Sequence, residues 1–338
     1  MACPMEFYVG LAIILFVLTF FPKGIGLYVL IFFALLVLGS LRSIEVGTDT
    51  ENYYELYQTI IALDDISYAF ALIEPSWVLL NLFSYNLFDS YQGVLWMGMF
   101  LVITPISIRI WKSCNNPYQG VLFYVLLFFY FNAYNITRQM IAVSFFFYAL
   151  PFLEIRDWKK YYLFVFIAMS FHYTSLICLF FPLLLQYLRL SKFSVFVLLP
   201  LTYFLGIVLL PSLVSFVPFL GKYSVYLVDD AKASGSITRL LLNMFFMFIY
   251  ISSKPHSIYM KMLFLGIIFY NLFAFSAVLG RCAIFFMIAQ LILFCNIQSQ
   301  FKCNVYMQKT AMLLYAVCYY ITLLFANSNE VIPYELWK

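Results

Sequence analysis

The stretch VLFYVLLFFYFNAYNITRQMIAVSFFFYALPF, residues 121–152, decides how this chain folds. Two almost purely apolar runs flank a short polar insert, FNAYNITRQM, which contains three amide side chains and Arg138. Each apolar run approaches the roughly 20 residues that a helix needs to cross a bilayer. The stretch therefore predicts two membrane helices that reverse direction at the polar insert.

The composition of the whole chain agrees with this interpretation. Of its 338 residues, 65% are hydrophobic and 10% are charged, whereas soluble domains carry about 25% charged residues. A soluble core cannot absorb so much apolar surface, so part of that surface must face lipid. We expect an all-α, polytopic integral membrane protein.

The apolar segments predict about ten to twelve transmembrane helices in a single domain, residues 1–338. They lie at about 6–21, 25–41, 70–88, 91–110, 118–134, 138–154, 161–185, 193–211, 238–252, 257–278, 281–296 and 305–325. Hydrophilic stretches at about 42–69 and 212–237 are predicted to be outer loops.

Basic residues in short loops indicate which side of the membrane each loop occupies. The segments RIWKSCNNP (109–117) and RDWKK (156–160) are basic, which is typical of cytoplasmic loops. The hairpin between them would then turn at the outer face. This topology predicts that Arg138 lies at the outer membrane surface.

Two segments do not fit a topology in which successive loops simply alternate between the two sides of the membrane. Either 70–88 is re-entrant or an amphipathic stretch at 52–63 partly enters the membrane. The segment 161–192 is either one span or two half-helices that break at FHYT, residues 171–174. Irregular backbone at membrane depth is tolerated only against protein or a water-filled cavity.

Several function classes lack their motifs. The sequence contains no Walker motif, GxGxxG, HExxH or CxxC pair, so nucleotide hydrolysis, dinucleotide redox chemistry and zinc hydrolysis have no support. The basic residues are dispersed and do not form the basic patch or stripe that is typical of nucleic-acid-binding proteins. The seven cysteines are scattered, and we expect them to be small core residues rather than disulfide partners or metal ligands.

Ionisable side chains inside apolar segments are costly and often functional. Arg138 opens a helix, where it opposes the helix dipole unless an anion binds there; it could equally be an interface arginine that reaches lipid headgroups. His172 lies near mid-membrane and is either satisfied by an interhelical hydrogen bond or donates to a phosphate or moves a proton. Asp49 is either a helix N-cap or a general base.

Three stretches together resemble the EpsG family. VGTDTENYYELY (46–57) is similar to its first-loop element, the segment 135–177 to its central Arg-Gln and Phe-His signature, and NEVIPYELW (329–337) to its late element. Arg281 fits an arginine that opens a late helix in that family. The resemblance covers about residues 40–335.

The resemblance implies a Wzy-type glycosyltransferase that joins undecaprenyl-diphosphate-linked oligosaccharide repeats into O-antigen, capsule or exopolysaccharide chains. It implies a multi-pass protein of the bacterial inner membrane that works at the outer face without a cofactor. Besides the lipid-linked oligosaccharide and the bilayer, a chain-length regulator and a flippase are candidate partners, and nucleic acid is not. The open alternatives are a branching membrane glycosyltransferase and a transporter of lipid-linked saccharides.

The chemistry of glycosyl transfer suggests roles for the residues that carry the resemblance. Fixed cations would stabilise the charge on the departing diphosphate, and a carboxylate would accept the proton of the acceptor hydroxyl. The predicted catalytic residues are Asp49, Arg138 and His172, and the predicted substrate-binding residues are Arg42, Glu45, Gln139, Arg281 and Tyr53.

Overall fold

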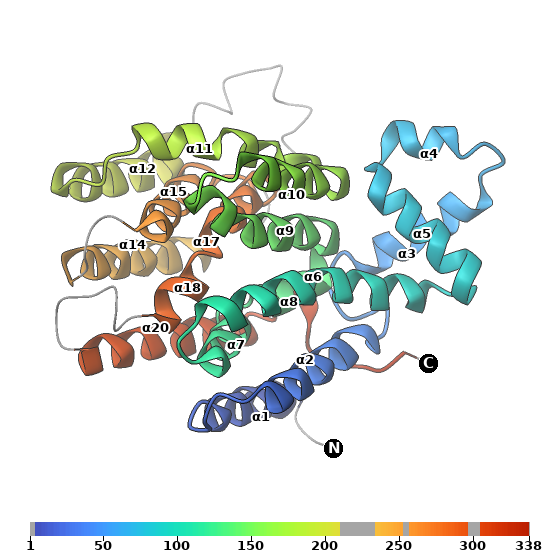
Figure 1. The fold of residues 1–338 in the computed structure, drawn as a ribbon, viewed down its shortest axis with the longest axis horizontal. Coiled ribbons are helices and arrows are strands. Elements are labelled where there is room, and N and C mark those ends of the chain that lie inside the picture. Colours follow the sequence, from blue (N-terminus) through green and yellow to red (C-terminus); the bar gives the residue numbers. More distant parts are fainter. Residues whose placement is uncertain (1–3, 210–233, 253–256, 297–304, 338) are drawn as a thin grey trace. The chain divides into compact units, whose positions relative to one another are not determined.

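The structure, a computed structural model, describes residues 4–209, 234–252, 257–296 and 305–337 (Figure 1). Helices make up most of this described part, where the one β contact is an isolated bridge between Arg42 and Leu336. The all-α prediction is therefore confirmed. Most of the predicted outer loop 212–237 lies outside the described residues.

The chain divides into two compact units, Met1–Leu179 with Ala316–Lys338, and Phe180–Tyr315. Two helices, α11 and α20, each cross the division between these units. The predicted single domain, residues 1–338, stays a prediction. The first unit holds α1 (Pro4–Leu18), α2 (Ile25–Ser40), α3 (Thr50–Ala62), α4 (Ser67–Leu72), α5 (Pro75–Phe88), α6 (Tyr91–Ser113), α7 (Pro117–Leu126), α8 (Phe129–Asn135), α9 (Thr137–Glu154), α10 (Trp158–Phe171), η1 (Tyr173–Leu176) and η6 (Ser328–Glu330). The second holds η2 (Ser194–Leu198), α12 (Leu199–Phe204), η3 (Leu205–Leu209), α14 (Ser234–Ser252), α15 (Ile258–Leu272), α16 (Ala277–Gly280), η5 (Arg281–Ala283), α17 (Ile284–Met287) and α18 (Gln290–Cys295), while α11 (Ile177–Tyr187) and α20 (Val305–Phe325) belong partly to each.

Helix α9 is the centre of the first unit. It packs between α6 and α10 (Figure 1), and most of its side chains are buried, including Phe146 and Phe147 at 0% exposure. A helix that is apolar all round is buried on every side or faces lipid. The apolar run after the polar insert thus forms the core around which the other helices of this unit pack.

Helices α3, α4 and α5 form a smaller cluster of their own. Ile60, Ala69 and Val78, one from each helix, make its buried centre. The predicted amphipathic stretch 52–63 therefore belongs to a helix, and its apolar side packs on protein.

The backbone is broken within two of the predicted apolar segments and at the polar insert between two others. Glu74 is extended (φ −58°, ψ 130°) and separates α4 from α5, because a residue before proline disfavours the α-helical conformation and Pro75 then starts the next helix. Ile136 (φ −104°, ψ 53°) separates α8 from α9. His172 is extended (φ −159°, ψ 118°) and ends α10, so the break at FHYT expected from the half-helix alternative is present.

Within the described ranges, α6 and α20 are the two helices long and apolar enough to cross a membrane by length and composition. Shorter apolar helices of 10–17 residues include α1, α2 and α15. The helical architecture is thus established, and the predicted count of transmembrane helices stays a prediction.

The prediction for the cysteines is wrong at two positions. Cys178, Cys282 and Cys318 are not disulfide-bonded, but Cys114 and Cys295 are. Spacing along the sequence carried no signal for this because neither cysteine belongs to a CxxC pair. Cys3 and Cys303 lie outside the described residues.

The first-loop element depends on a glycine. Gly47 has φ +104°, and a Cβ atom there would lie 2.8 Å from the carbonyl oxygen of Tyr134. Its amide donates to the carbonyl of Glu330 at 3.1 Å. Residue 47 must therefore be glycine for the loop to pack against both α8 and the C-terminal segment.

We predict that Gly47→Ala destabilises the protein by about 1–3 kcal/mol, because alanine is strained at this φ and collides with backbone. A lower thermal unfolding temperature in detergent would measure the effect. Gly26→Ala is the control, since a Cβ atom at Gly26 meets nothing within 4 Å. Equal unfolding temperatures for the two variants would contradict the prediction.

Candidate functional site

Glu74, Arg138 and His172 form a charged cluster in the first unit. Arg138 Nη1 donates to Glu74 Oε2 at 2.7 Å, and His172 Nδ1 lies 2.9 Å from Glu74 Oε1. Glu74 and His172 lie at helix breaks, and Arg138 follows the break at Ile136 by two residues. Arg138 and His172 are 64 and 98 positions from Glu74 in the sequence, yet each contacts one of its two carboxylate oxygens. We call these three residues the charged cluster.

Burial within the charged cluster is uneven. The Glu74 side chain is 7% exposed, whereas those of Arg138 and His172 are 26% and 23% exposed. The carboxylate thus lies behind the two basic groups and holds them in place. Glu74 also precedes the N-terminus of α5, where the helix dipole favours a negative charge.

The predicted residues on α3 lie beside the charged cluster. The Arg138 guanidinium lies 5.2 Å from the centre of the Tyr53 ring. The Tyr53 amide donates to the carbonyl of Asp49 at 3.0 Å, which places Asp49 one turn earlier on the same helix. Asp49 occupies the N-cap position of α3, but its carboxylate makes no capping hydrogen bond to that helix.

The amides of the polar insert connect Asp49 to the C-terminal segment. Asn135 Oδ1 accepts from the Asp49 amide at 2.9 Å, and Asn135 Nδ2 donates to Asn329 Oδ1 at 3.1 Å. Asn329 Nδ2 in turn donates to Asn132 Oδ1 at 2.8 Å. The amide side chains are therefore structural connectors between three distant parts of the chain.

The late element binds the first loop through backbone hydrogen bonds. Ser43 N donates to Glu335 O and Trp337 N donates to Leu41 O, both at 2.8 Å. The Tyr334 hydroxyl donates to the Leu38 carbonyl at 2.7 Å. The three stretches that carry the family resemblance thus converge in the first unit.

The structure places the other predicted residues differently. Arg42 is 1% exposed and donates to the carbonyls of Gly39 and Tyr134, so its contacts are with the protein itself. Burial also lowers the pKa of the Arg42 guanidinium. Glu45 is exposed, and Gln139 is buried in the first turn of α9. Substrate binding by these residues stays a prediction.

Arg281 belongs to the second unit and is described there. It begins η5, directly after α16, and is half-buried. Its predicted role as a substrate-binding arginine stays a prediction.

Glu74 is the member of the charged cluster that the sequence analysis does not predict. It is a lone carboxylate within the apolar segment 70–88, in the context LIEPSWVLL. An ionisable residue in such a segment is itself a sign of function, and the following proline signals a break. Both signals were present in the sequence, but neither indicates which cation the carboxylate contacts.

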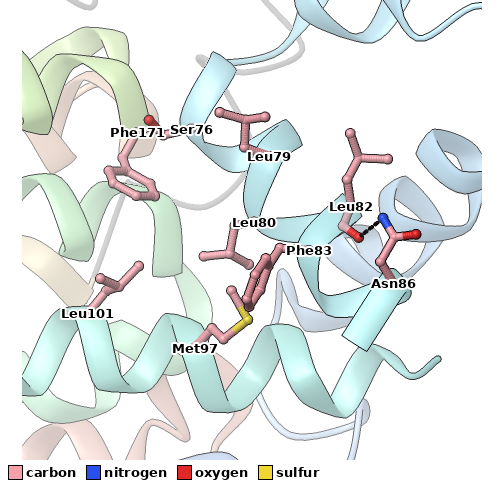
Figure 2. A pocket seen from close by; sticks show the side chains of 9 residues that line it. All are labelled: Ser76, Leu79, Leu80, Leu82, Phe83, Asn86, Met97, Leu101 and Phe171. Atoms are coloured by element: carbon pink, nitrogen blue, oxygen red, sulfur yellow. Dashed lines mark hydrogen bonds between the residues drawn. The ribbon is translucent and has the colours of Figure 1, made fainter. Parts of the chain in front are cut away.

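The first unit also contains an apolar pocket (Figure 2). It has a volume of about 520 Å³ and is lined mainly by side chains of α5 and α6, with Phe171 at the end of α10. Ser76, two residues after Glu74, and Phe171, directly before His172, both line it. The Ser76 and Ser170 hydroxyls are hydrogen-bonded at 2.7 Å and join α5 to α10 at this point. The residues that line the pocket are Ser76, Leu79, Leu80, Leu82, Phe83, Asn86, Met97, Leu101 and Phe171.

No group of three or more His, Cys, Asp or Glu side chains in the described ranges could hold a metal ion. The charged cluster offers an arginine cation, an imidazole and one carboxylate, and the Tyr53 ring lies against the arginine. Such an arrangement suits an amphiphile with an anionic head group, because arginine donors recognise phosphate oxygens well. It also contains an imidazole, which can transfer a proton near neutral pH.

Comparison with known proteins identifies the family. No curated protein and no solved structure matches the chain. A family model described as the EpsG family matches residues 25–336, which include the whole charged cluster and, apart from Trp337, all three convergent stretches. The chain therefore belongs to the EpsG family.

Proposed function

We propose that this protein is a polysaccharide polymerase of the bacterial inner membrane that extends a glycan from undecaprenyl-diphosphate-linked oligosaccharide repeats. Membership of the EpsG family supports a polymerase-type function in polysaccharide synthesis. The observation that carries the proposal is the charged cluster, where a partly exposed arginine and histidine are held by one buried carboxylate.

Arg138 is the proposed ligand of the diphosphate. Cleavage of the glycosyl–diphosphate bond builds negative charge on the leaving group, and a preorganised cation at that position lowers the barrier. The contact with Glu74 fixes the guanidinium before substrate arrives, so little reorganisation is needed. The energy of the glycosyl–diphosphate bond drives the transfer, and no nucleotide is consumed.

The apolar pocket in the first unit is the proposed site for the first isoprene units of the carrier lipid. Its lining is almost entirely hydrocarbon, and its Ser76 and Phe171 walls adjoin Glu74 and His172 along the chain. A polyprenyl diphosphate has the matching order of groups, because its anionic head is joined directly to a branched hydrocarbon chain. We propose a multi-pass protein with this site at the outer face of the bilayer.

The decisive experiment is reconstitution in proteoliposomes with defined undecaprenyl-diphosphate-linked repeats. A polymerase yields a ladder of products that differ by one repeat unit. Addition of one sugar per repeat would identify a branching glycosyltransferase, and passage of unchanged repeats across the bilayer would identify a transporter. Either of these outcomes would overturn the proposal.

We predict that Arg138→Lys lowers kcat roughly 10²- to 10³-fold, because a lysine provides a point charge without the planar fork of donors. The rate of ladder formation in proteoliposomes measures this. Arg156→Lys is the matched control, since Arg156 is exposed in the loop between α9 and α10. Normal polymerisation by Arg138→Lys and Arg138→Ala would remove Arg138 from the site.

We predict that Leu79→Trp raises KM for a donor with a full-length polyprenyl chain but not for a donor with a two-isoprene chain. Leu79 lines the pocket and is 56% exposed, so the indole can enter the pocket without disturbing the core. Leu163→Trp on α10 is the control, at 55% exposure and away from the pocket lining. An unchanged KM for the long donor would exclude this pocket as the lipid site.

A further inference from the structure

The geometry points to His172 as the general base of the transfer reaction, with Glu74 as the residue that positions it. This inference rests on the proposed function. It concerns the proton of the acceptor sugar hydroxyl, for which Asp49 is the candidate predicted from the sequence.

The first step of the argument is the tautomer of His172. Arg138 donates to one oxygen of Glu74 at 2.7 Å, and this cation favours the ionised carboxylate. An ionised carboxylate only accepts hydrogen bonds, so His172 Nδ1, 2.9 Å from Oε1, must carry the proton. In the neutral imidazole, Nε2 then holds the lone pair.

The second step is the accessibility of that lone pair. The only side-chain hydrogen bond that the described chain gives His172 is the one from Nδ1, and the side chain is 23% exposed. Its backbone is extended at the junction of α10 and η1. In the proposed reaction, Nε2 is the atom that meets the hydroxyl group of the acceptor.

The third step is the electrostatics of proton transfer. The buried Glu74 stabilises the imidazolium that forms when Nε2 takes a proton, as a carboxylate does behind a catalytic histidine in other enzymes. Among the described residues, Arg138 is the other charged side chain in contact with Glu74, and the Tyr53 ring lies against Arg138.

The reaction is then a direct displacement at the anomeric carbon. The acceptor hydroxyl oxygen forms a bond to that carbon while its proton passes to His172 Nε2. The bond between the anomeric carbon and the diphosphate oxygen breaks, and the diphosphate leaves with the electron pair toward Arg138. The imidazolium later releases its proton to water, which restores the starting state.

The test compares His172→Gln, His172→Ala and Glu74→Gln in the reconstituted assay. Glutamine can still donate a hydrogen bond to a phosphate but cannot accept a proton as a base. We expect His172→Gln to lower kcat roughly 10²- to 10⁴-fold with KM for the lipid-linked donor unchanged. Added imidazole should restore part of the activity of His172→Ala, which also shows that this variant is folded.

Glu74→Gln should lower kcat in the same range without a rise in the KM for donor, because its amide no longer fixes the Nδ1–H tautomer. Glu55→Gln is the matched control, since Glu55 is exposed on α3. If Glu74→Gln does not fold, Glu74→Asp keeps the charge and should retain more activity than His172→Gln.

If His172→Gln keeps the wild-type kcat, the inference is overturned. If Asp49→Asn also loses activity while His172→Gln stays active, the base is Asp49. Failure of the proposed function has a different signature. If the wild-type protein transfers one sugar and forms no ladder, the polymerase proposal fails, while the same variants still test the base on the single-sugar product.

Discussion

The Glu74 carboxylate, shared between Arg138 and His172, is the interaction on which the site depends. A buried carboxylate without partners costs several kcal/mol, and so does an unpaired cation among apolar helices. One carboxylate with two basic neighbours solves both problems in a single contact. It also leaves the arginine and histidine more exposed than the acid, which is the arrangement that an anionic substrate requires.

The helix breaks make this contact possible. An unbroken apolar helix directs its side chains sideways, toward other helices or lipid, whereas a break frees backbone groups and lets a side chain enter the gap. Glu74, the residue pair Ile136–Thr137 before Arg138, and His172 lie at such breaks. Irregular backbone of this kind survives in an apolar setting only where protein or a cavity satisfies it.

The C-terminal segment connects the first loop to α8. It pairs with the first loop, and Asn329 connects to Asn132 and Asn135. Asn135 then holds the amide of Asp49, one turn before the Tyr53 that faces Arg138. Residues nearly 300 positions apart in this chain thus belong to one set of hydrogen bonds.

The sequence by itself determined the all-helical class and the family resemblance, and it singled out Arg138 and His172 as candidates, since apolar runs and misplaced charges are local properties of a chain. It also contained the Glu-Pro break, but a single carboxylate carries no sign of its partners. Only the tertiary structure decided that Glu74 contacts both Arg138 and His172, that Arg42 turns inward to backbone carbonyls, and that Cys114 and Cys295 are disulfide-bonded. These are contacts between residues far apart in the chain, and packing in three dimensions selects them rather than local spacing.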